Sequence, residues 1–201
     1  MNDTYHLLTT FPIETLDDLE GRTIVGAPPL APWLGGTGAI AVAGGLPSMY
    51  QQIQTGVAEG TIIIPTGAYP LRLHEVAPYV TLVDTGVTTT GGLAVNADSW
   101  DRFPEDVQTV LTELGLEYSL GHAQIVKDMS DEIVQRMGDE GSTIYPLPDS
   151  DRAAWVAGLP DLGANWIEAV SDQGLPGAEV MSAFMEGARA RGAEPLRNWD
   201  E

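Results

Sequence analysis

One long run of helical periodicity, from Pro104 to Met137, constrains the fold of this chain more than any other feature. Asp101 to Glu105 supplies acidic and proline start signals, and Gly138 supplies a stop. A run of about 34 residues at 1.5 Å each gives a helix of roughly 50 Å, which is longer than one small lobe is wide. We therefore predict a helix that needs a long surface to lie against. Its apolar stripe repeats at steps of three, four or seven residues and consists of Val107, Leu111, Leu114, Tyr118, Ile125, Met129, Ile133 and Met137.

Short β-branched runs alternate with helical segments in the rest of the chain, and this alternation predicts an α/β layer fold with a mainly parallel sheet. We expect the tail from Gly192 onward to be frayed. Strands are predicted at 5–11, 22–27, 60–65, 79–84, 92–96 and 142–148. Helices are predicted at 14–19, 47–57, 69–76, 149–155, 162–170 and 176–191, with Asp149 as a cap, and the small-residue stretch 33–45 is also predicted to be helical.

Composition narrows the class of protein. The 201 residues are 43% hydrophobic, which is enough for the core of one domain or of two small lobes. No apolar run approaches the roughly 18 residues of a membrane span, so a soluble chain without membrane insertion is predicted. The 29 acidic and 9 basic residues give a net charge of −20, which argues against nucleic acid and anionic membrane surfaces as partners. Residues 1–20 lack the pattern of a secretory signal, so any export signal is expected outside this sequence.

Residue types that carry chemistry do not form a catalytic pattern. The chain has no cysteine, and its histidines, His6, His74 and His122, have no partner at metal-ligand spacing. A nucleophile elbow and a phosphate-binding loop are both absent from the sequence, and Gly35-Gly-Thr-Gly38 lacks dinucleotide-binding spacing, so it indicates only a close backbone approach. We therefore predict no catalytic residues, no metal site, no cofactor and no enzymatic activity.

Two strand ends are of more interest, because open parallel sheets bind ligands outside the carboxyl ends of their strands. The segment 28–33 follows one predicted strand and ends in Trp33, and the segment 65–69 follows another and ends in Tyr69. Each segment offers an aromatic ring and little charge. These rings can stack on a small apolar or sugar-like ligand, and ordinary packing explains them equally well.

An ordered series of motifs resembles the extracytoplasmic solute-binding proteins of TRAP transporters, of the dicarboxylate-binding type. The segment 16–21, LDDLEG, is similar to the family's entry to a strand. The segment 49–60, MYQQIQTGVAEG, resembles the more specific signature of tyrosine, glutamine-threonine-glycine and acidic-glycine. HEVAPYVT at 74–81, then LAVN at 93–96 with Trp100 and Pro104, continue the series, so the resemblance covers at least residues 14–190.

The resemblance implies a periplasmic receptor with type II-like α/β lobes that captures a small organic solute, such as an organic acid or sugar acid, and delivers it to TRAP membrane permease subunits. Family members are longer, so the chain looks like their C-terminal two-thirds. We expect four parts: a crossover from a missing or partial first lobe (1–20), a second lobe (21–92), a return strand with the lobe-spanning helix (93–140), and a C-terminal strand with helices packing on the second lobe (141–201). The alternative is a truncated or vestigial one-lobe interaction protein without a closed ligand cleft.

The ligand clamp implied by the resemblance is altered. Val25 stands where the family usually has an arginine that pairs with a solute carboxylate, and the usual asparagine falls within 62–64, which are all isoleucine. Either Arg22 or Arg72 holds a carboxylate, or the solute is less charged and is gripped by aromatic and hydroxyl side chains; we favour the second. The predicted ligand-binding residues are Trp33, Thr37, Tyr50, Thr66, Tyr69 and Asn96.

Overall fold

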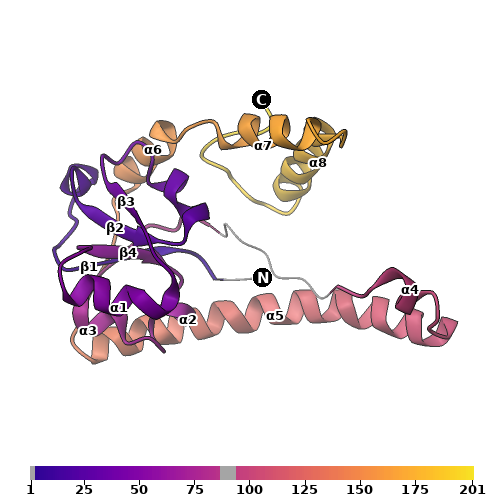
Figure 1. Ribbon diagram of the computed structural model, residues 1–201, viewed down its shortest axis with the longest axis horizontal. Coiled ribbons are helices and arrows are strands. Elements are labelled where there is room, and N and C mark those ends of the chain that lie inside the picture. The colour runs from indigo at the N-terminus through magenta and orange to yellow at the C-terminus, as the bar shows by residue number, and fades with distance from the viewer. Residues whose placement is uncertain (1–2, 87–93) are drawn as a thin grey trace.

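The computed structural model describes residues 3–86 and 94–201, and one mixed sheet organises them (Figure 1). β1 runs antiparallel to both of its neighbours, β4 and β5, and every other neighbouring pair is parallel. The α/β class with a mainly parallel sheet is therefore confirmed, as are the predicted strands other than 92–96. In the order in which they lie side by side, the strands are β3 (Ile40–Ala43), β2 (Thr23–Gly26), β4 (Gly60–Ile63), β1 (His6–Thr9), β5 (Tyr79–Leu82) and β6 (Thr143–Pro146).

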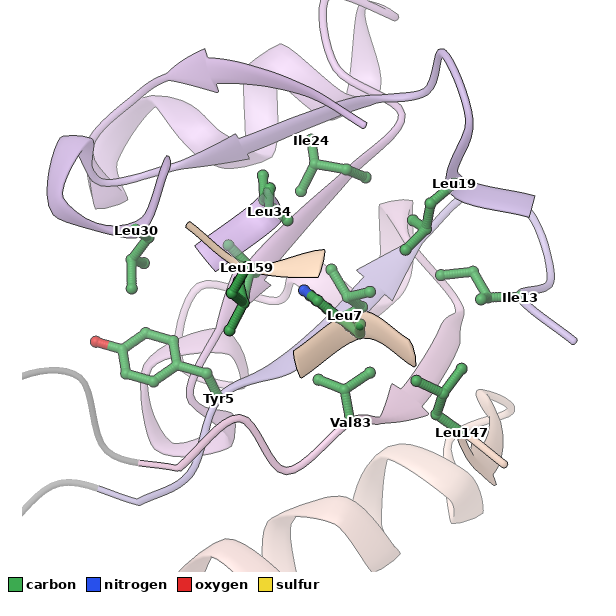
Figure 2. Close-up of a cluster of buried hydrophobic side chains, with 12 residues drawn as sticks. Tyr5, Leu7, Ile13, Leu19, Ile24, Leu30, Leu34, Val83, Leu147 and Leu159 are labelled. Carbon is green, nitrogen blue, oxygen red and sulfur yellow. The ribbon is translucent and has the colours of Figure 1, made fainter. Parts of the chain in front are cut away.

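Both faces of the sheet are covered, because alternate residues of its central strands enter two separate apolar cores. Leu7, Ile24 and Ile62 point into one core together with Trp155 of α6 (Asp149–Gly158) and Leu159 directly after it, and we call it the α6-side core (Figure 2). Their chain neighbours Leu8, Val25 and Ile63 point into the other, together with Met49 and Ile53 of α1 (Leu46–Gln54). Ile133 and Met137 of the long helix complete this second core, which we call the α5-side core.

The predicted long helix is confirmed as α5 (Glu105–Asp139), with 35 residues. Among its described apolar side chains, Val126, Ile133 and Met137 are buried, and the last two belong to the α5-side core. The N-terminal part runs past the sheet toward the short helix α4 (Ala97–Trp100) in Figure 1. Its exposed apolar side chains include Val107, Val110, Leu111, Leu114, Tyr118 and Ile125. No helix in the described ranges is both long and apolar enough to cross a membrane.

The prediction of a helix over 33–45 is wrong. A 3-10 helix, η2 (Pro28–Leu34), occupies the start of this stretch, and strand β3 occupies the end. The glycines between them break the helix: Gly36 has φ +75°, and a Cβ there would lie 2.6 Å from the backbone of Gly158. The close backbone approach expected of this glycine cluster is thus confirmed. β3 forms because 40–43 pairs with the open edge of β2.

Three smaller predictions also needed correction. The segment 69–76 is not one helix, because α2 (Pro65–Ala68) and α3 (Leu73–Val76) flank a break at Arg72, whose φ is +56°. Of the predicted strand 92–96, residues 92 and 93 lie outside the described residues, and 94–96 form no strand. Asp149 lies in the first turn of α6 instead of capping it, since the cap residue is Pro148.

The C-terminal tail is packed, contrary to the expectation that it frays. The helices α7 (Leu162–Ser171) and α8 (Gly177–Arg189) precede this tail. The 3-10 helix η1 (Leu16–Leu19), near the start of the chain, is the remaining helical segment of the described residues. Arg189 forms two hydrogen bonds to the carboxylate of Asp200, at 3.0 and 2.7 Å. Trp199 lies against Gly163, where a Cβ would be 2.4 Å from the Trp199 carbonyl oxygen. These contacts fold the tail back over α7.

Candidate functional site

One edge of the sheet gathers the strand ends at which a ligand site is expected. β1 runs opposite to the other described strands, so their carboxyl ends meet the start of β1 at this edge. The segments that leave it include η2 after β2, α2 after β4, and residues 83–86 after β5. In open α/β sheets, ligands bind in the crevice outside such an edge.

A cavity of about 270 Å³, which we call the strand-end pocket, opens at this edge. Three parts of the chain build it: the sheet edge, α6 and the packed C-terminal tail. Its volume lies just below the ~300–1,000 Å³ typical of drug-sized ligands, so it suits a smaller molecule. Its lining includes Trp33, residues 83–86, Arg152, Trp155, Leu159, residues 194–197 and Trp199.

Three indoles give the strand-end pocket its apolar walls. The side chain of Trp155 is buried in the α6-side core, and its Nε1–H donates a hydrogen bond of 2.8 Å to the carbonyl oxygen of Trp33. Trp33 itself is half-buried and packs against the same core. Trp199 lies under the guanidinium of Arg197, with 4.6 Å from that group to the ring centre. The pocket can therefore bury the apolar body of a ligand.

Two guanidinium groups face the pocket, and they differ in how firmly they are held. Arg197 donates to the carbonyl oxygen of Leu159 at 2.8 Å and lies 3.4 Å from Asp161. Among the described residues, the ion-pair partner of Arg152 is Asp84, with 3.9 Å between Nη1 and Oδ2, which is too long for a hydrogen bond. Beside them, the Thr85 hydroxyl oxygen is buried and has no hydrogen-bond partner within the described chain. Among the described residues, Arg152 thus leaves hydrogen-bonding capacity at the pocket, whereas the Thr85 hydroxyl oxygen is buried.

Asp84 connects this pocket to a buried histidine. It has φ +49° and lies 3.9 Å from His6 Nε2, and its backbone N–H reaches His6 Nδ1 at 3.5 Å. Burial lowers the pKa of His6 from its usual 6.5, while the nearby Asp84, Asp3 and Asp131 oppose that shift. The folded chain therefore favours the neutral imidazole.

This pKa shift predicts a pH-dependent stability. As the pH falls through 6.5, the unfolded chain binds a proton at His6 before the folded chain does, so the free energy of unfolding decreases. We expect urea denaturation between about pH 8 and pH 5.5 to show this loss, and we expect His6→Gln to reduce the pH dependence. An equal pH dependence in the variant would contradict the assignment to His6.

The predicted ligand-binding residues do not gather in one place. Trp33 lines the strand-end pocket. Thr37 lies at the end of the loop that follows η2, where its hydroxyl donates to the carbonyl oxygen of Leu34 at 2.7 Å and accepts from the N–H of Ala39 at 3.2 Å. Tyr50 lies on α1 and packs against the α5-side core. Among these residues, Trp33 is thus the one placed directly at the pocket.

The other three predicted ligand-binding residues make separate contacts within the chain. Thr66 lies in α2, directly after β4 at the sheet edge, and its backbone N–H donates a hydrogen bond to Asp3 Oδ2 at 3.1 Å. The Tyr69 hydroxyl donates to Glu140 at the end of α5, at 2.6 Å, and this bond raises the pKa of Tyr69. Asn96 caps α4 by accepting from the N–H of Ser99 at 3.1 Å. Tyr69 thus helps to fasten α5, and Asn96 starts a helix.

Arg22 and Arg72, the two residues considered as partners of a solute carboxylate, form ion pairs at the surface. Arg22 pairs with Glu59 at 2.7 Å and lies over the ring of Phe11. Arg72 pairs with Glu75 one helical turn away. Val25 is fully buried in the α5-side core. None of these three residues lines the strand-end pocket.

Comparison with known proteins assigns the chain to a family. Residues 1–168 match the model of the bacterial extracellular solute-binding proteins, family 7. The chain belongs to this family. The family 7 chain is 30% identical over 148 residues to the C4-dicarboxylate-binding periplasmic protein DctP of Rhodobacter capsulatus, which covers 73% of this chain and 42% of the relative.

Solved structures agree on the fold of this family 7 protein. A TRAP periplasmic solute-binding protein from Desulfovibrio salexigens, in an open complex, matches with a TM-score of 0.81 and 24% identity over 97% of this chain and 62% of that one. A second protein from Desulfovibrio salexigens, with bound orotic acid, matches with a TM-score of 0.76 and 22% identity over 94% and 60%. The chain spans less than two thirds of each of these relatives. The members of this family and the proteins in these two solved structures are solute-binding proteins.

Sequence reasoning missed most of the family 7 protein's strand-end pocket. Arg152 and Trp155 lie on a helix that was predicted, but nothing in their spacing linked them to a strand end. Trp199 lies in the tail that was expected to fray. A signal was available there, because segments that stay disordered are poor in aromatic residues, and Arg197 and Trp199 are only two positions apart.

Proposed function

We propose that this chain is the solute-binding part of a periplasmic TRAP-type receptor, which holds a small organic acid at the strand-end pocket and delivers it to membrane permease subunits. The observation that carries the proposal is the guanidinium of Arg152, which is paired only loosely with Asp84 among the described residues and lies in a pocket with indole walls. A guanidinium in such a setting pairs well with a carboxylate, because its N–H groups match both carboxylate oxygens.

The chemistry of the relatives supports an acidic solute. One relative is named for C4-dicarboxylates, and one solved structure holds orotic acid. The usual clamp position holds a buried Val25 in this chain, so the guanidinium must come from another element. Arg152 on α6 supplies it here. A solute with one carboxylate and a flat or apolar body fits this set of groups better than a dicarboxylate.

Calorimetric titration tests the proposal with a panel of small monocarboxylates, dicarboxylates, sugar acids and neutral sugars. We expect at least one monocarboxylate to bind. Replacing Arg152 by glutamine is expected to weaken that binding by about tenfold or more, because a hydrogen bond to a charged group contributes about 1.5–3 kcal/mol. Replacing Trp33 by alanine is expected to weaken it by roughly 1–3 kcal/mol through lost stacking and burial.

Arg102→Gln is the matched control, because Arg102 is exposed and its guanidinium donates a local hydrogen bond to Ser99 at 3.0 Å. This variant should bind like the wild type. Unchanged affinity in both Arg152→Gln and Trp33→Ala would remove the solute from the strand-end pocket. If no compound in the panel binds, the chain by itself does not act as a receptor.

A further inference from the structure

The strand-end pocket presents a guanidinium and a carboxylate close together. Arg152 on α6 and Asp84, which follows β5, both belong to the pocket lining. Arg152 Nη1 and Asp84 Oδ2 are 3.9 Å apart, so the two groups attract each other without forming a hydrogen bond. The pocket thus offers a charged donor and a charged acceptor within reach of one small molecule.

Both groups are open to a ligand. The side chain of Arg152 is 36% exposed and that of Asp84 is 53% exposed, so neither has to be uncovered before it can bind. The other oxygen of Asp84, Oδ1, lies 3.9 Å from His6 Nε2. Burial favours the neutral imidazole of His6 by lowering its pKa, although Asp84, Asp3 and Asp131 oppose this shift. The histidine therefore does not neutralise the Asp84 carboxylate.

This pair of charges treats a simple acid and a zwitterion differently. A solute with a carboxylate alone is attracted by Arg152 and repelled by Asp84, and the net charge of −20 on the chain adds repulsion at long range. A solute that also carries an ammonium group has no net charge, and its N–H groups can donate to Asp84. An α-amino acid carries its carboxylate and its ammonium group on neighbouring atoms, which suits protein groups this close together.

The walls of the pocket fit the same class of solute. The indoles of Trp33, Trp155 and Trp199 can cover an apolar side chain, and an indole face also attracts a cationic nitrogen. The volume of about 270 Å³ limits the solute to a small molecule. The lining therefore combines a place for a carboxylate, a place for an ammonium group and an apolar surface.

We propose that the strand-end pocket selects a small zwitterion of the α-amino acid class, whose carboxylate pairs with Arg152 and whose ammonium group donates to Asp84. This inference rests on the proposed function and names the class of solute at the same site. Asp84 is then the residue that determines specificity, because it favours an amino acid over an acid of the same size without the ammonium group.

Calorimetric titration with two matched pairs of compounds tests this specificity. The first pair is L-phenylalanine and hydrocinnamate, which differ in the ammonium group. The second is pipecolate, as each enantiomer, and cyclohexanecarboxylate, in which a ring CH2 replaces the ring ammonium. We expect the amino acid of at least one pair to bind about tenfold or more tightly than its partner, because a hydrogen bond between charged groups is among the stronger ones.

Asp84→Asn tests the residue itself. Asparagine has nearly the same size and tolerates the φ of +49° at this position. We expect the variant to bind the amino acid about tenfold more weakly, because the charged acceptor is lost. It should bind the matched simple acid more tightly, because the repulsion is lost as well. A general disturbance of the pocket would weaken both compounds, so opposite changes identify the charge of Asp84 as the cause.

Asp98→Asn is the matched control, since Asp98 is an exposed acid on α4, outside the pocket lining. It should leave both affinities unchanged, and thermal unfolding shows whether each variant keeps its fold. The wild-type comparison needs no variant, so it decides the matter even if Asp84→Asn does not fold.

The outcomes separate this inference from the proposed function. Equal or tighter binding of the simple acids in both pairs, or an unchanged preference in a folded Asp84→Asn, would overturn the zwitterion and leave the acid receptor standing. Binding of other acids from the panel, without binding of any amino acid, would do the same. If neither the pairs nor the panel bind, the proposed function fails together with this inference.

Discussion

Replacing Trp155 by alanine is expected to lower the free energy of unfolding by about 3–5 kcal/mol, the usual range for removing a buried aromatic side chain. Trp155 is 2% exposed in the α6-side core, and its indole N–H holds the carbonyl oxygen of Trp33 at 2.8 Å. The substitution therefore leaves a cavity and an unpaired carbonyl group. Urea denaturation measures the loss.

Trp166→Ala is the matched control for this experiment. Trp166 is 41% exposed on α7, so its removal should cost about 1 kcal/mol or less. A loss in Trp155→Ala no larger than in Trp166→Ala would show that α6 does not pack on the sheet as described. Trp155→Phe should restore part of the stability but not the hydrogen bond to Trp33.

Replacing Met137 by alanine is expected to lower the free energy of unfolding by about 2–5 kcal/mol. Met137 is fully buried in the α5-side core, beside Ile133 and the strand residues of that face. It is one of the few side chains that attach α5 to the sheet. Urea denaturation should show the loss, and hydrogen exchange should show faster opening of the C-terminal part of α5.

Met129→Ala on the same helix is the control for Met137→Ala. Met129 is 42% exposed, so the change should cost less than about 1 kcal/mol. Similar losses in the two variants would contradict the finding that α5 is attached through its C-terminal end. Because both substitutions remove the same atoms from a helix, their difference isolates the effect of burial.

The elements that the sequence predicted correctly are those whose pattern is local. The stripe of α5 repeats over many turns, and the β-branched run 60–65 is bounded by glycine and proline, so both are visible without the rest of the fold. β3 was missed because 40–43 carries small residues and becomes a strand by pairing with β2. Tertiary pairing decided its structure. The packing of the tail was missed for the same reason, since Trp199 packs against Gly163 of α7, which is distant in the sequence.

The candidate site was less predictable than the fold. Trp33 could be named because it follows a strand end directly, and parallel sheets place ligands there. Arg152 lies far along the chain and reaches the pocket only because α6 packs across the sheet edge. The departure at Val25 was visible in the sequence. In our proposal Arg152 takes the place of the family's arginine, and its position depends on which distant helix covers that edge, so no spacing rule contains this information.

The attachment of α5 at one end has a mechanical consequence. The helix is held near Glu140 by Tyr69 and His74, at 2.6 and 2.8 Å, and by its buried C-terminal side chains. From Val126 to its first residue, Glu105, it forms a stiff lever arm. A tilt of about 10° at the held end would carry the far end by about 5 Å, since about 21 residues at 1.5 Å each make up the arm. A small rearrangement at the sheet would thus be amplified at the tip.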